Sequence, residues 1–230
     1  MLEFLAANEL AILRWLHIIA MVYWLGGEWG VFQTSYKVVN PALSLEERRR
    51  HMQTAYRIDI LARIGIISLL PLGLHMGYLW GVQPLGGGWL VGMWAAYALW
   101  LGITLGAFAL RGQPVGKALS LLEDWSRYLL IPTLVLVAAA SLAGFGPLAA
   151  ETGQRWYSAK MLTYGLLLVI GVILRLIMHE WQKLFPVLAQ GSNPTVEQKL
   201  RGSIRLGRSV AYVYWIGIMT TGFFGAVKPF

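Results

Sequence analysis

Six apolar stretches, separated by short polar or basic segments, dominate the pattern of the chain. Each is long enough to cross a bilayer as a helix, which takes about 20 residues. The stretches lie near residues 10–32, 58–80, 89–110, 128–145, 157–181 and 209–227. The pattern predicts an all-α integral membrane protein in which residues 1–230 form a single bundle of about six transmembrane helices.

The ends and interiors of these helices carry further local signals. Pro71 and Pro132 fall within apolar stretches, where we expect them to kink the helices. The segment 44–57 (SLEERRRHMQTAYR) is charged and rich in helix formers, and it begins with a capping box from Ser44 to Glu47. It is predicted to extend the second helix beyond the membrane.

Basic residues gather in alternate loops. The loops after the first, third and fifth stretches contain Lys37, Arg48, Arg49, Arg50, Arg57, Arg111, Lys117, Arg127, Lys183, Lys199, Arg201, Arg205 and Arg208. The other loops have few charges, and the positive-inside rule then places both termini outside. The net charge of +8 is therefore a topology signal and does not indicate nucleic-acid binding. We expect a bacterial inner-membrane protein with both termini in the periplasm.

Composition agrees with this class and restricts the chemistry. Charged residues make up 13% of the chain, against about 25% in soluble domains. The chain has no cysteine, which excludes disulfides, thiolate metal sites, iron–sulfur clusters and covalently attached c-type haem. Any haem in this protein must be held without covalent attachment.

Two histidines lie at membrane depth. His17 is seven residues into the apolar stretch Leu10–Val31, and His75 is five residues before the end of Ile64–Trp80. Consecutive helices run antiparallel, so at about 1.5 Å of rise per residue both side chains lie about 10 Å below the same face. Intramembrane ionisable groups indicate functional sites. The pair predicts axial ligation of a b-type haem, whereas the alternative is two core imidazoles, each of which donates to a carbonyl or serine on the next helix.

Neighbouring residues extend this prediction. His17, Met21, Trp24 and Glu28 form one stripe on the first helix, which is expected to face the interior. On the second helix Leu61, Ile64, Ser68, Pro71 and His75 share a face. The cations Arg14, Arg155 and Lys160 lie near the outer boundary, where they would either bind haem propionates or extend to the membrane interface.

A second set of polar residues lies toward the cytoplasm. His51 and His179 would provide a second ligand pair, unless both are simply hydrated at the interface. Glu28 and Arg175 reach a similar depth and are expected to pair, because buried opposite charges are usually paired. Together with Tyr164 they are candidate contacts for protons or a quinone. Three histidines adjoin a methionine, a chemistry that copper sites favour.

Several short motifs resemble one membrane-protein superfamily. Arg14-Trp15-Leu16-His17, followed by Trp24 and Gly27, resembles the first helix of the HemJ-type protoporphyrinogen oxidases and of the related copper-resistance D (CopD-like) proteins. The continuation Glu46–Tyr56, followed by Pro71, Gly73 and Leu74, and the sequence Trp156-x-x-x-Lys160 fit the same pattern.

The resemblance implies roles for two residues, haem b binding for His17 and a functional role for Lys160. The chain departs from the family at Arg14, where a lysine is usual, and at Phe32-Gln33-Thr34, where a Pro-Arg pair and a second histidine are usual. It also has more predicted spans.

These observations favour a b-type haem-binding electron-transfer protein that relays electrons between a periplasmic or membrane redox partner and the quinone pool, as a subunit of a larger complex. No residue is assigned a catalytic role. The alternatives are a HemJ-like oxidase of protoporphyrinogen, a CopD-like copper transport or resistance protein, and an assembly subunit without a cofactor.

Overall fold

The computed structural model describes residues 1–146, 148–151 and 153–230. Within these ranges the chain is helical and contains no strand. Its helices are α1 (Leu2–Ala7), α2 (Glu9–Val38), α3 (Leu45–Leu79), α4 (Gly88–Ala109), α5 (Pro114–Leu142), α6 (Arg155–Leu188) and α7 (Pro194–Val227). Six of them, α2 to α7, are long and apolar enough to cross a membrane. The predicted class, an all-α membrane protein with six spans, is confirmed.

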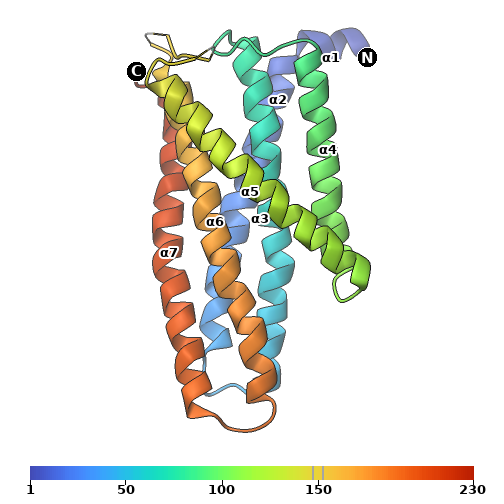
Figure 1. Cartoon of the computed structure of the whole chain (residues 1–230), viewed down its shortest axis with the longest axis vertical. Coiled ribbons are helices and arrows are strands. Elements are labelled where there is room, and N and C mark those ends of the chain that lie inside the picture. Colours follow the sequence, from blue (N-terminus) through green and yellow to red (C-terminus); the bar gives the residue numbers. More distant parts are fainter. Residues whose placement is uncertain (147, 152) are drawn as a thin grey trace.

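Helices α2, α3, α6 and α7 form the central bundle, in which α2 packs mainly on α3 and α6 on α7 (Figure 1). Helix α4 packs against α3, and α5 crosses the bundle obliquely to contact α4 and α6. Both termini lie at one end, here called the terminal end, and the loops 39–44 and 189–193 lie at the other, here called the basic-loop end (Figure 1). The two termini therefore share a face, as predicted.

Close contact between α2 and α3 depends on small residues. A Cβ on Gly65 would lie 2.5 Å from the carbonyl oxygen of Ala20, and a Cβ on Gly27 would lie 2.9 Å from the Cβ of Ala62. Only glycine lets the backbones approach this closely, which is the usual way that membrane helices pack. Gly27 therefore accommodates the neighbouring helix.

The basic-loop end is closed by polar contacts. The predicted capping box is present, since Ser44 Oγ accepts from the Glu47 amide and Glu47 Oε2 accepts from the Ser44 amide. Arg48 donates to both carboxylate oxygens of Glu197, at 2.6 and 2.9 Å, and so joins α3 to α7. This pair lies in the charged segments that precede the apolar parts of both helices. The hydrogen bonds from Arg48 lower the pKa of Glu197.

One part of the prediction is wrong. The sequence pattern places Lys117 and Arg127 in the loop after the third stretch, but both lie in α5, which begins at Pro114 and has 29 residues. The basic residues expected in the loop after the fifth stretch also lie in helices, Lys183 in α6 and Lys199, Arg201, Arg205 and Arg208 in α7. Proline suits the first turn of a helix because its missing N–H has no intrahelical partner there. The charges of this segment are accommodated because several of them pair inside the bundle, as described below.

Candidate functional site

A cavity of about 330 Å³, here called the upper cavity, lies between α2, α3, α6 and α7 toward the terminal end. Ligand cavities in proteins typically measure about 300–1,000 Å³. Its lining includes Arg14, His17, Met21, Trp24, Gly73, Met76, Trp80, Trp156, Lys160, Met161, Tyr164 and Gly225. Most of these side chains are apolar or aromatic, and the two charged ones, Arg14 and Lys160, are both cationic.

His17 is the central polar group of the upper cavity. Its Nδ1 is buried and has no hydrogen-bond partner in the described part of the chain. A buried polar atom without a partner costs about 1–3 kcal/mol, so native structures rarely keep one without a ligand or water. The ring lies beside Gly73, where an added Cβ would be 3.6 Å from His17 Cε1. The absence of a side chain at Gly73 leaves room next to the imidazole.

Lys160 is the second polar group of this cavity. A Cβ on Gly225 would lie 2.5 Å from the Lys160 Nζ, so the glycine makes room for the ammonium group. No carboxylate lies within 4 Å of Lys160 among the described residues. Arg14 also lines the cavity and is exposed, whereas Arg155 is exposed and does not line it. Of the three predicted propionate partners, the structure therefore places two at this cavity.

The structure does not bring His75 to the upper cavity. Its Nδ1 accepts a hydrogen bond from Trp94 Nε1 at 3.2 Å, and its Nε2 lies 3.3 Å from Glu9 Oε1. His75 does lie at about the depth of His17, as predicted. Gly73, which is only two residues from His75, lies beside the His17 ring. Two residues correspond to about 200° around a helix, however, so His75 points away from His17.

The predicted face of the second helix accordingly packs on α4. Ser68 Oγ is 2.8 Å from Tyr97 Oη, and Pro71 borders a groove lined by Trp89 and Trp100. Both nitrogens of His75 have protein partners, but these are a tryptophan N–H and a carboxylate and not the carbonyl or serine of the alternative prediction. His51 and His179 do not share a site either. His179 lines a cavity near the basic-loop end, and His51 does not line that cavity.

A group of paired charges, here called the charged cluster, lies deeper in the bundle. It consists of Asp59, Arg63, Glu123, Asp124, Arg127 and Arg175. Glu123 is only 1% exposed and lies 2.5 Å from Arg127, 3.1 Å from Arg175 and 3.8 Å from Arg63. Buried ions at membrane depth are costly unless they are paired, and here one carboxylate faces three guanidinium groups.

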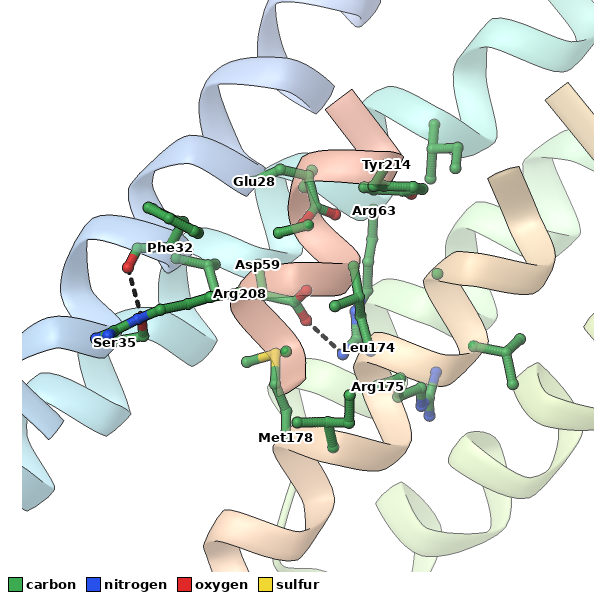
Figure 2. Close-up of a pocket in the computed structure, with 18 of the residues that line it drawn as sticks. Glu28, Phe32, Ser35, Asp59, Arg63, Leu174, Arg175, Met178, Arg208 and Tyr214 are labelled. Carbon is green, nitrogen blue, oxygen red and sulfur yellow. Dashed lines mark hydrogen bonds and ion pairs between the residues drawn. The ribbon is translucent and has the colours of Figure 1, made fainter. Parts of the chain in front are cut away.

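The predicted ion pair between Glu28 and Arg175 is wrong. Arg175 pairs with Glu123 and Asp124, both at 3.1 Å, because α5 crosses the bundle and brings these carboxylates to α6. Glu28 and Arg175 instead line a common central cavity of about 90 Å³, and Figure 2 shows the Glu28 side chain on the α2 side of it. The stripe on α2 does face the interior, since His17, Met21 and Trp24 line the upper cavity and Glu28 the central one.

One hydrogen bond separates the two cavities. Trp24 Nε1 donates to Tyr214 Oη at 3.0 Å, and each side chain is only 1% exposed. Trp24 lines the upper cavity, and Tyr214 lines the central one. Tyr164 also lines the upper cavity, and its hydroxyl donates to the carbonyl of Ile66 at 2.7 Å.

The fold and these cavities define a multi-span helical membrane protein with a polar interior. Comparison with protein-family models, curated proteins and solved structures finds no match for the chain. The resemblance to the HemJ and CopD-like proteins stays a prediction that rests on its short motifs.

Proposed function

We propose that this protein binds a b-type haem in the upper cavity through His17 and transfers electrons between a redox partner at the terminal end and the membrane quinone pool. The observation that carries the proposal is the buried, unpartnered Nδ1 of His17 in a cavity lined mainly by aromatic and apolar groups. Neutral imidazole is a common axial ligand of haem iron, and a bound haem supplies one-electron transfer.

The residues around His17 fit a porphyrin. Lys160 and Arg14 would bind its carboxylates, since charge-assisted hydrogen bonds to carboxylates are among the stronger ones. Gly73 and Gly225 leave space beside His17 and Lys160 respectively. Trp80 and Trp156 provide aromatic surface in the same cavity. The same features would suit a porphyrin substrate, as in the HemJ-like alternative.

We assign the axial ligand to His17 alone. His75 is directed toward Trp94 and Glu9 and does not line this cavity. If His17 is the only protein ligand, a bound haem would give a high-spin spectrum. This expectation differs from that of bis-histidine ligation, which gives a low-spin spectrum.

Haem content tests the proposal directly. The wild-type protein, purified from cells supplied with haem, should contain bound b-type haem, and His17→Ala should lose it. His75→Ala and His51→Ala serve as matched controls and should retain the wild-type spectrum. A His17→Ala protein with unchanged haem content would refute the assignment. A low-spin spectrum that is lost in His75→Ala would restore the histidine pair.

Electron transfer is tested separately, with duroquinol as the reductant. In proteoliposomes the bound haem should be reduced by duroquinol, as followed by absorbance. Reduction by dithionite but not by duroquinol would support haem binding and contradict the link to quinones.

One observation favours a second candidate function, copper handling. Met21, Met76 and Met161 line the same cavity as His17. Thioether and imidazole ligands suit Cu(I), and this combination fits the CopD-like alternative. Metal analysis of the purified protein distinguishes the two, because a colourless preparation with bound copper that is lost in His17→Ala would favour copper.

A further inference from the structure

The charged cluster lies between two cavities. The lower cavity, of about 260 Å³, lies beside the turn 110–113 and the start of α5, and it is lined there by Arg111, Gly112 and Lys117. Asp59, Arg63 and Arg175 line both this cavity and the central one. The two spaces therefore meet at a shared wall of charged side chains.

The central cavity has polar groups that need partners. Arg175 Nε, Arg127 Nη1 and Arg208 Nη2 are buried without a hydrogen-bond partner within the described ranges, and all three residues line this cavity. Buried waters typically satisfy such groups and need about 10–15 Å³ each of accessible volume. The cavity volume of about 90 Å³ therefore has room for several waters. The composition of its wall predicts that it is hydrated.

Glu28 lies on the far side of this space. It lines the cavity together with Asp59 and Arg63 from α3, Arg175 from α6, Arg127 from α5 and Tyr214 from α7. Arg208 from α7 also lines it, but Figure 2 shows its guanidinium group directed to Ser35, to which its Nε donates at 3.1 Å. It has no ion-pair partner within 4 Å among the described residues. Beyond it the bond from Trp24 to Tyr214 closes the route to the upper cavity. Glu28 is thus a carboxyl group at the closed end of a polar passage.

We propose that the lower and central cavities form a water-filled inlet that carries protons from the basic-loop end to Glu28. A hydronium ion entering from that end gives its proton to the Glu28 carboxylate, which becomes a neutral carboxylic acid. Ionisable groups inside membranes commonly mark such proton relays. The proposal goes beyond electron transfer and does not depend on haem, because it concerns cavities that His17 does not line.

The absence of cysteine allows a direct test of water access. Ser35→Cys places a thiol in the central cavity, and Ser120→Cys places one in the lower cavity. Ser203 provides the matched control, since it is 9% exposed, bonds to Trp181 and lines neither cavity. Each variant is placed in sealed vesicles and treated with Ag⁺ from one side. Protection from a maleimide added after denaturation then reports the reaction.

We expect Ag⁺ added at the basic-loop side to protect Ser120→Cys first and Ser35→Cys more slowly, and to leave Ser203→Cys unprotected. Addition at the terminal side should protect none of them. If Ser35→Cys reacts no faster than Ser203→Cys while Ser120→Cys reacts, the passage is closed at the charged cluster and the proposal fails. Circular dichroism of each variant verifies that the helices are intact.

Infrared difference spectra test the proton acceptor itself. Acidification from an alkaline starting pH should produce a protonated-carboxyl band in the wild type that is absent from Glu28→Gln and retained in Glu46→Gln, a change at an exposed carboxylate in the basic-loop region. The band should shift within the time of transfer to D₂O, because water reaches the group. A band that persists in Glu28→Gln, or one that does not exchange, would overturn the proposal.

Discussion

The upper cavity and the charged cluster lie in the same bundle, but they differ in whether their charged and polar side chains have partners within the protein. Among the described residues of the upper cavity, the Nδ1 of His17 has no hydrogen-bond partner and the ammonium of Lys160 has no carboxylate within 4 Å, and apolar or aromatic groups surround them. In the charged cluster Glu123 alone contacts three arginines. Both sets are buried in a helical bundle of low charge content.

The difference separates two reasons for keeping ionisable groups in a membrane. Paired charges largely compensate one another, and their loss is felt as instability. Unpaired groups are destabilising unless something binds them, so they indicate a ligand. The comparison therefore predicts that variants of the charged cluster change stability, whereas variants of the upper cavity change ligand binding.

The largest effect is expected from Glu123→Gln. This change leaves Arg63, Arg127 and Arg175 without their common carboxylate partner, and breaking a buried pair costs about 3–5 kcal/mol. Denaturant unfolding in detergent micelles, followed by circular dichroism, measures the loss. Glu46→Gln is the control, because its pair with Arg50 is exposed, and its stability should match that of the wild type. Equal stability of the two variants would show that the cluster is not structural.

A smaller effect, on binding alone, is expected from Lys160→Met. Loss of one charge-assisted hydrogen bond, about 1.5–3 kcal/mol, should weaken the binding of added hemin about 10-fold or more and leave the unfolding free energy unchanged or higher. Arg155→Met is the matched control, since Arg155 lies outside the cavity lining. Titration of each purified apoprotein with hemin measures the affinity of the two variants. Similar weakening in Arg155→Met would show that the hemin carboxylates contact the N-terminal end of α6 as well.

The sequence predicted the bundle well because hydropathy reports directly on membrane spans. It also predicted that the stripe from His17 to Glu28 faces inward, since three- and four-residue spacing fixes one side of a helix. It could not show which neighbour each side of α3 meets. His75 was therefore matched to His17 in depth but not in direction, because the direction depends on the position of α4.

The charged cluster was missed for a related reason. The loop pattern includes Arg127 and does not single out Glu123, although both lie in α5 and pair with one another. A usable signal was present at Asp59 and Arg63, which are four residues apart within the second predicted span. An acidic and a basic residue at that spacing inside an apolar helix indicate a buried pair. The oblique path of α5, which completes the cluster, has no counterpart in the sequence pattern.

The hydrogen bond between the two regions provides a third, intermediate test. Trp24→Phe removes the donor to Tyr214, and Tyr214→Phe removes the acceptor. Each should cost about 0.5–1.5 kcal/mol of unfolding free energy, and the double variant should cost less than the sum. The same unfolding measurement gives all three values. Strictly additive losses would mean that this bond contributes nothing, and the cavities would then be separated by packing alone.

The smallest effect concerns the Arg48–Glu197 pair at the basic-loop end, which lies outside both regions. Hydrogen bonds from Arg48 lower the pKa of Glu197 in the folded state below its ordinary value of 4.5. A lowered carboxyl pKa gives stability that is fully present above pH 4.5 and is lost as the pH falls through the folded-state value. Because the pair is partly solvated, we expect about 1 kcal/mol or less.

The comparison of wild type with Glu197→Gln isolates this pair from the two buried regions. The difference in unfolding midpoint should be constant near neutral pH and should shrink below pH 4.5, where the wild-type carboxylate takes up a proton. A difference that stays the same at acid pH would mean that Glu197 acts through packing and not through its charge. The bidentate contact would then resemble the charged cluster in form but not in energetics, because water reaches the partly exposed Glu197 side chain, whereas Glu123 is buried.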